Sequence, residues 1–122
     1  MGSVLYKFGE VLKDGLRKGE TVNGIHIEVI PESSVVAIYE GQVMFTGYRR
    51  GYGNAVIIDH GGNYFTLSAH LDAIFVREGD QVEQNQQLGT SGDIATLYEP
   101  GLYFEIRQGS TPLDPLKWIQ TE

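Results

Sequence analysis

Short β-branched and aromatic runs separated by glycines are the feature that most limits how this chain can fold. The chain has sixteen glycines, spread along almost its whole length, and few segments with helical periodicity. Many short strands joined by tight turns are typical of all-β domains. The opening segment 4–18 is the exception, because Val11, Leu12 and Leu16 could share a helical face, whereas Gly9 and Gly15 favour an irregular lead-in.

Alternation of apolar and polar residues indicates the individual strands. From Gly24 onwards Ile25, Ile27 and Val29 fall on one face and His26 and Glu28 on the other, which predicts a strand with one buried side. The turn Gly61-Gly62-Asn63 predicts a hairpin between strands at 54–59 and 64–70. Further short strands are expected at 36–38 and 43–45 as a pair, and at 76–82 and 87–89, with a loop at 47–53.

Composition narrows the class of partner. With 122 residues the chain has the size of one domain. Its net charge of −7 argues against a nucleic-acid partner and against contact with an anionic membrane. The chain has no cysteine, so disulfides and thiolate metal sites are excluded, and no apolar run approaches the roughly 20 residues of a spanning helix. The first three residues, Met-Gly-Ser, suggest a remnant of cloning on a piece of a longer protein.

The segment Gly101-Leu102-Tyr103-Phe104-Glu105-Ile106-Arg107 carries the most specific motif. Leu102, Phe104 and Ile106 should enter the core and leave Tyr103, Glu105 and Arg107 on an exposed face. The segment resembles the H-L-H-F-E-[IV]-R strand of LytM/lysostaphin-type zinc peptidases, and further motifs follow the family's order across 22–27, 37–43, 51–61, 68–71 and 76–89. The resemblance implies an all-β, antiparallel sandwich or barrel of the duplicated-hybrid-motif type with a central groove, spanning 19–119 after a lead-in at 1–18.

The residues that bind zinc in that family are replaced in this chain. Their positions match Val22, His26 and Tyr103, and the other histidine of the H-x-H pair is replaced by Gly101. Valine and glycine offer no donor, and a neutral phenol is a poor zinc ligand. His70 matches the family's catalytic histidine, but without a metal-bound water it has no nucleophile to act on. We therefore expect no bound metal or other cofactor, and no hydrolysis.

Among relatives without catalytic ligands, the chain is most similar to EnvC-type murein hydrolase activators, which share the L-Y-F-E-I-R strand. The resemblance implies that the former catalytic groove binds a cell-wall amidase, an N-acetylmuramoyl-L-alanine amidase, in the periplasm or cell envelope during peptidoglycan remodelling and cell separation. Peptidoglycan is a further ligand to consider. The positions expected to line this groove are Asn23, His26, Tyr52, His70, Tyr103 and Arg107. Aromatic and arginine side chains are frequent binding hot spots.

Other interpretations stay open at this point. An active zinc endopeptidase could use His26, His70 and an acid, and a degenerate domain could instead be a structural or glycan-binding envelope module. A carrier module is disfavoured because no lysine lies between Lys18 and Lys117. His26 could equally be an idle surface residue. His60 fits a structural hydrogen bond best, and the Arg49-Arg50 pair could steer an acidic partner or form a solvated loop tip.

Overall fold

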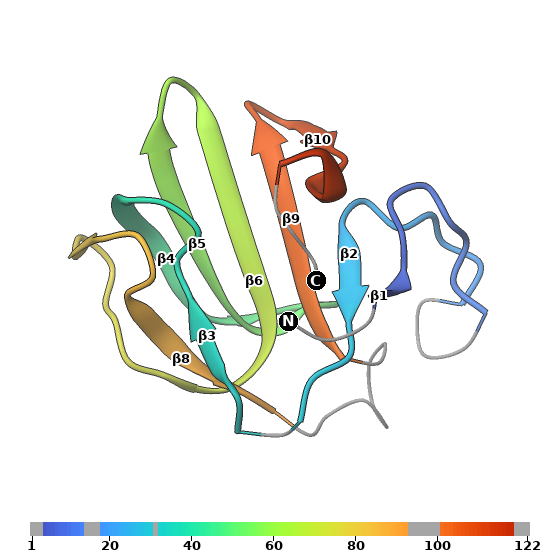
Figure 1. The fold of residues 1–122 in the computed structure, drawn as a ribbon, viewed down its shortest axis with the longest axis horizontal. Coiled ribbons are helices and arrows are strands. Elements are labelled where there is room, and N and C mark those ends of the chain that lie inside the picture. The colour runs from blue at the N-terminus through green and yellow to red at the C-terminus, as the bar shows by residue number, and fades with distance from the viewer. Residues whose placement is uncertain (1–3, 14–17, 31, 93–100, 119–122) are drawn as a thin grey trace.

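An antiparallel meander of three long strands forms the framework of the computed structural model, which describes residues 4–13, 18–30, 32–92 and 101–118 (Figure 1). Within these residues the chain forms ten strands and one short 3₁₀ helix. Their bounds are β1 Val4–Tyr6, β2 Ile25–Ile27, β3 Ser34–Val36, β4 Gly41–Arg49, β5 Gly53–Gly61, β6 Tyr64–Ile74, β7 Gln81–Val82, β8 Gln87–Ser91, β9 Leu102–Gln108, β10 Thr111–Leu113 and η1 Pro115–Lys117.

The predicted hairpin between β5 and β6 is confirmed, and its turn residues explain it. Gly61, Gly62 and Asn63 all have positive φ angles, of 86°, 60° and 70°. Glycine and asparagine adopt this left-handed conformation most readily, and it matches the twist of the strands that the turn joins. The turn therefore fixes the register in which β5 and β6 pair.

Strand order places β9 in the middle of the sheet, next to the segments that carry the candidate site. The main path runs β1-β2-β9-β6-β5-β4-β7, and all pairs are antiparallel. In this register Tyr103 of β9 lies between His26 of β2 and Ala69 of β6. The all-β antiparallel class that the sequence predicts is confirmed.

Three predictions about strand bounds and pairing are wrong. The strand expected at 76–82 is confined to β7, Gln81–Val82. β3 pairs with β8 and not with the strand that follows it, so the expected pair of 36–38 with 43–45 does not form. β4 continues to Arg49 through the segment that was expected to start a loop, because Gly47, Tyr48 and Arg49 pair with β5. Glycine in a strand weakens it without ending it when long-range pairing supplies the hydrogen bonds.

The N-terminal segment packs on the sheet as an extended chain. β1 pairs with β2, Val11 forms a bridge with Thr21, and Leu12 is buried. The helical alternative is therefore wrong for residues 4–13, and residues 14–17 lie outside the described part of the chain. The family motifs begin after this segment, yet residues 4–13 contribute to the packing of the domain.

Both faces of the central strands are covered, which the alternation pattern does not reveal. One cluster, centred on Tyr103, packs on one face of the sheet. Two other clusters pack on the opposite face, around Ile25 and Phe104 and around Val56 and Ile58. All three residues of β2 are buried, so the prediction that this strand has a single buried side is wrong.

After β10 the C-terminal segment makes a single 3₁₀ turn, η1. Asp114 caps this turn by accepting a hydrogen bond from the backbone N–H of Leu116. Trp118 packs against the ring of Tyr64 at 5.5 Å between centroids and stays about half exposed. Among the described residues there is no helix long and apolar enough to cross a membrane.

Candidate functional site

Three of the six predicted site residues form one buried aromatic cluster. His26 of β2 and His70 of β6 flank Tyr103 of β9, with ring centroids 4.8 Å and 6.1 Å from that of Tyr103. The two histidine rings lie 6.0 Å apart. The side chains are between 1% and 2% exposed, so the idea that His26 is an idle surface residue is wrong. The strand register explains the cluster, because β9 lies between the other two strands.

A bulge in β6 sets the position of His70. Asn54 pairs with Leu71 and Ala55 pairs with Ala69, so His70 is the extra residue between them. Its φ angle of 67° lies in the left-handed region, which costs a non-glycine residue roughly 1–3 kcal/mol. The Nδ1 atom of His70 lies 2.6 Å from the carbonyl oxygen of Gly101. Because a carbonyl can only accept, Nδ1 carries the proton and this contact orients the ring.

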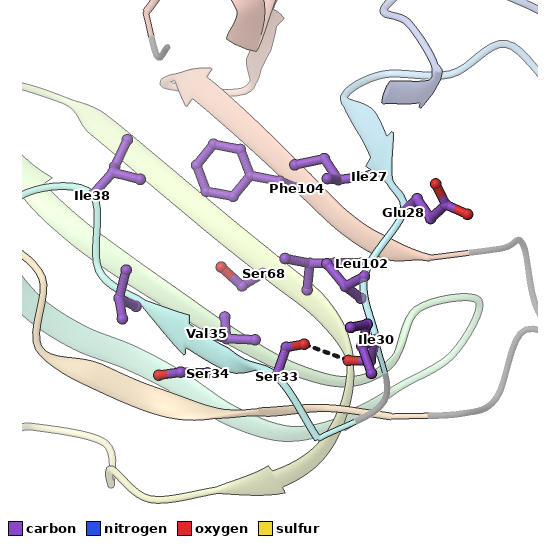
Figure 2. Close-up of a pocket in the computed structure, with 12 residues that line it drawn as sticks. Ile27, Glu28, Ile30, Ser33, Ser34, Val35, Ile38, Ser68, Leu102 and Phe104 are labelled. Carbon is purple, nitrogen blue, oxygen red and sulfur yellow. Dashed lines mark hydrogen bonds between the residues drawn. The ribbon is translucent and has the colours of Figure 1, made fainter. Parts of the chain in front are cut away.

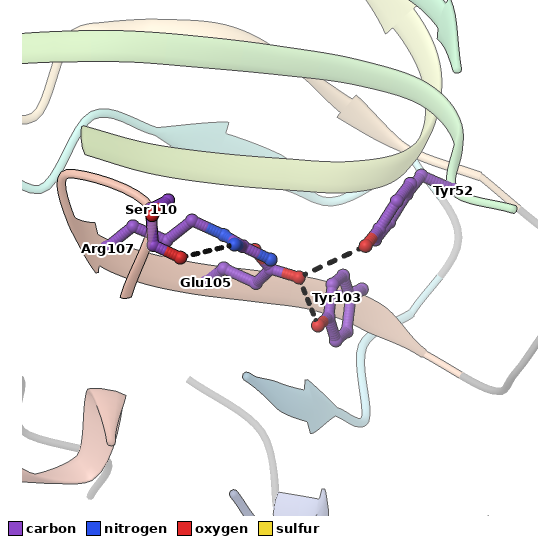
Figure 3. A network of polar contacts seen from close by, with 5 residues as sticks. All are labelled: Tyr52, Tyr103, Glu105, Arg107 and Ser110. Carbon is purple, nitrogen blue, oxygen red and sulfur yellow. Dashed lines mark hydrogen bonds and ion pairs between the residues drawn. The ribbon is translucent and has the colours of Figure 1, made fainter. Parts of the chain in front are cut away.

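A hydrogen-bonded network extends from the cluster towards solvent along β9 (Figure 3). Glu105, which is 1% exposed, accepts hydrogen bonds from the hydroxyl groups of Tyr103 and, at 3.4 Å, Tyr52. Its other oxygen accepts from Nε of Arg107 at 2.6 Å. Arg107 also donates from Nη1 to the carbonyl oxygen of Ser110 at 3.1 Å. A buried carboxylate needs such partners, and here three side chains supply them.

Glu105 is the residue that sequence reasoning missed. Alternation places it on the same strand face as Tyr103 and Arg107, two residues from each, and this spacing was the available signal. The carboxylate, as the nearest hydrogen-bond acceptor, holds the pKa of the Arg107 guanidinium above its ordinary value, although partial burial acts in the opposite direction. Arg107 therefore pairs with Glu105 itself and stays positively charged.

The prediction that Tyr103 is exposed is wrong, and the cover explains why. Leu12, Val22 and Tyr52 pack with Tyr103 in one cluster, and the ring of Tyr6 meets His26 edge-on at 5.5 Å. This cover comes from the N-terminal segment and from the turn after β4, both distant in sequence from β9. Alternation locates the face of a strand, but it does not say whether another segment covers that face.

The other three predicted residues form the accessible margin. Asn23, Tyr52 and Arg107 are each partly exposed, and the Arg107 side chain is 32% exposed. Tyr52 and Arg107 both line a hollow of about 190 Å³, together with Arg49 and apolar side chains of β5 and β6. A partner that approaches this face can therefore contact the margin directly and the buried cluster only indirectly.

A larger hollow lies on the opposite face of the sheet. It measures about 490 Å³, and mostly apolar residues of β2, β3, β9 and the chain between β2 and β3 line it (Figure 2). Phe104 and Leu102 point into it, and these residues alternate along β9 with Tyr103. None of the six predicted site residues lines this hollow, so the two faces of β9 carry different surfaces.

The donor atoms of the described residues do not fit the zinc ion that the resemblance implies. Val22 has no donor atom. The hydroxyl of Tyr103 is a neutral phenol that is hydrogen-bonded to Glu105, whereas the usual zinc ligands are imidazole, thiolate or carboxylate groups. Within the part of the chain that the structure describes, no group of three histidine, cysteine, aspartate or glutamate residues lies close enough to hold a metal.

The backbone conformation at Gly101 leaves no room for a side chain. Its φ angle is 78°, and a Cβ atom at this position would lie 2.3 Å from the carbonyl oxygen of Ile27. A contact that short requires the backbone to move, and positive φ disfavours any residue with a side chain. A histidine at position 101 therefore does not fit the present backbone.

Fold, strand order and motif positions together define a LytM-type antiparallel β domain. The sequence pattern described as Peptidase family M23 matches residues 20–115, and the chain belongs to this family. The catalytic domain of the antimicrobial peptidase lysostaphin from Staphylococcus simulans has the same fold, with a TM-score of 0.82 at 24% sequence identity, covering 96% of this chain and 91% of that one.

Several relatives are named murein hydrolase activators, among them NlpD and EnvC. NlpD of Escherichia coli (strain K12) is 34% identical over 119 residues, which cover 97% of this chain and 29% of NlpD. EnvC of the same organism is 30% identical over 118 residues, which cover 97% of this chain and 27% of EnvC. The chain thus spans less than a third of the length of either activator.

Proposed function

We propose that this M23 domain binds and activates a cell-wall amidase, an N-acetylmuramoyl-L-alanine amidase, and does not itself hydrolyse peptidoglycan. The observation that carries the proposal is the chemistry of the former catalytic face. There, a tyrosine hydroxyl donates to a buried glutamate at a position where the active family requires a zinc ligand. An arrangement of this kind neither holds a metal nor activates a water molecule, because it offers too few lone pairs at one point.

The names of the relatives support the proposal that the domain activates a hydrolase. NlpD and EnvC are both called murein hydrolase activators, and each is at least 30% identical to nearly all of this chain. A murein hydrolase cleaves peptidoglycan, so activation through a domain of this kind requires contact with the hydrolase. We place the protein in the periplasm or cell envelope, where that substrate is found, as a participant in peptidoglycan remodelling and cell separation.

We propose that the docking surface comprises Asn23, His26, Tyr52, His70, Tyr103 and Arg107. Asn23, Tyr52 and Arg107 make direct contact because they are partly exposed. The buried residues His26, His70 and Tyr103 support the exposed ones from below. Tyr103 and Tyr52 both donate hydrogen bonds to the Glu105 carboxylate, and the same carboxylate binds Arg107. Aromatic and arginine anchors on a rigid support are the usual composition of a binding hot spot.

The test is release of dye from labelled peptidoglycan by the domain alone, by an amidase alone, and by both together. The proposal predicts no release by the domain and more release by the pair than by the amidase alone. Arg107→Ala should lower the stimulation, whereas Arg77→Ala, which removes an exposed arginine from a distant turn, should not. Zinc-dependent release by the domain alone would support the endopeptidase instead. Binding to peptidoglycan with no effect on any amidase would support the structural or glycan-binding module.

A further inference from the structure

The hollow beside the Glu105 network brings two arginines together in an otherwise acidic chain. Arg107 lines it from β9 and Arg49 from the end of β4, and Tyr52 lines it from the turn between β4 and β5. The chain carries a net charge of −7, and only nine of its residues are lysine or arginine. Two arginines in one small hollow are therefore a local departure from the charge of the whole molecule.

Apolar side chains of β5 and β6 form the floor of the hollow that the two arginines line. Leu67 of β6 pairs with Glu105 of β9 on one side and with Ile57 of β5 on the other, and all three line the hollow. Phe65, beside Arg107 in the same register, adds a further apolar wall. Apolar surroundings lower the local dielectric, which strengthens hydrogen bonds between a charged donor and an acceptor.

Among the residues that the structure describes, the charges that line the hollow leave one cation, Arg49, without an acidic partner. Glu105 pairs with Arg107 at 2.6 Å and neutralises it, and the same arginine is fixed further by the Ser110 carbonyl (Figure 3). Arg49 lies over the ring of Phe45, with its guanidinium carbon 5.8 Å from the ring centroid, and its side chain is exposed. The aromatic contact orients Arg49, and among the described residues no hydrogen bond to its N–H groups is seen, so these groups can donate to a planar anion in a bidentate manner.

We infer that this hollow receives the carboxylate of one aspartate or glutamate side chain from the protein partner. The inference rests on the proposed function and adds the chemical group that the partner must present. The volume of about 190 Å³ is below the roughly 300 Å³ at which small-molecule pockets begin, so the hollow fits one amino acid side chain better than a glycan strand. Arg49 supplies the charge, the fixed Arg107 supplies the second wall, and the floor packs against the methylene groups of the incoming side chain.

The chain offers a matched pair of variants for the test. Arg49 and Arg50 are adjacent and both exposed, but only Arg49 lines the hollow. Arg49→Gln and Arg50→Gln therefore change the net charge equally and differ in position. The affinity of each variant for an amidase that the wild-type domain binds is measured by titration calorimetry, at low and at high salt. Binding to purified peptidoglycan is measured in parallel by co-sedimentation, and thermal melts check that both variants are folded.

The inference predicts that Arg49→Gln weakens amidase binding about tenfold, the scale of a charged hot-spot contact, while Arg50→Gln stays within about twofold of wild type. Equal losses for both variants that vanish at high salt would reduce the effect to general steering and overturn the inference. A loss of peptidoglycan binding with unchanged amidase binding would assign the hollow to a peptidoglycan carboxylate, and would also overturn it. If the wild-type domain binds no amidase, the proposed function fails, and that result is distinct from a difference between the two variants.

Discussion

Replacement of Glu105 by glutamine isolates the contribution of the buried carboxylate, because it removes the charge and keeps the size. The carboxylate accepts from the Tyr103 hydroxyl and from Arg107 Nε, and its side chain is 1% exposed. In Glu105→Gln the amide oxygen can face Arg107 Nε, and the NH₂ group then faces the Tyr103 hydroxyl, which must accept and leave its own proton without an acceptor. The variant should remain folded but should be less stable than the wild type.

The expected loss follows from the bonds that change. Hydrogen bonds to a charged group contribute about 1.5–3 kcal/mol and neutral ones about 0.5–1.5 kcal/mol, so each of the two close bonds loses about 1 kcal/mol. An unsatisfied buried donor adds about 1–3 kcal/mol. Arg107 is 32% exposed and can turn its guanidinium to water, so the free-energy loss from its bond to residue 105 lies at the lower end of the range. The sum is about 3 kcal/mol, which for a domain of this size corresponds to a melting temperature about 10 °C lower.

The measurement is urea unfolding followed by circular dichroism, with thermal melts in parallel. Glu78→Gln serves as the control, because Glu78 is exposed in a turn and its replacement should change the stability by less than about 0.5 kcal/mol. If Glu105→Gln unfolds at the same urea concentration as Glu78→Gln, the carboxylate does not hold the network together. The account of how β9 supports the docking margin would then be wrong.

Three further outcomes follow from the same geometry. Tyr103→Phe removes one hydrogen bond to a buried carboxylate and should lower the free energy of unfolding by about 1.5–3 kcal/mol. Tyr39→Phe, at an exposed tyrosine, should leave the free energy of unfolding unchanged. Equal effects of the two variants would contradict the network. Gly101→His should destabilise the fold by at least about 1–3 kcal/mol, because the Cβ would meet the Ile27 carbonyl, and a variant of wild-type stability would show that the site still accepts the histidine. The raised pKa of Arg107 means that its pairing stabilises the fold at every pH below the ordinary arginine value and is lost only as pH rises through the folded value. The stability difference between wild type and Arg107→Gln should therefore be equal at about pH 6 and about pH 9, and a large change between them would contradict that sign.

The sequence predicts those parts of the fold that depend on neighbouring residues. The turn at 61–63 is a local pattern, and it is confirmed. Alternation along β9 is also local, but the exposure that it predicts for Tyr103 and Glu105 is wrong, because both are buried. The pairing of β3 with β8 joins segments about fifty residues apart, and no local pattern marks it. Glycine is typical of loops, so the sequence predicts that Gly47 lies in one. Its place in β4 instead depends on pairing with β5.

The candidate site shows the same division between local pattern and distant contact. His26, His70 and Tyr103 were selected because they match positions of a known family, and the strand register brings them together. Their burial depends on Tyr6, Leu12 and other residues of the lead-in, which the motifs do not include. The pairing of Glu105 with Tyr103 and Arg107 was within reach of alternation alone, since all three occupy one face of one strand.

The central claim is that the former catalytic face lacks the donors to hold zinc, and metal content tests it most directly. The purified domain is dialysed against micromolar zinc and then against buffer, and bound metal is measured by mass spectrometry beside the lysostaphin catalytic domain and the His26→Ala variant. The account predicts less than about one tenth of an equivalent of zinc in this domain, since His26 and His70 have no third ligand beside them among the described residues. One equivalent of tightly bound zinc that is lost in His26→Ala would contradict it.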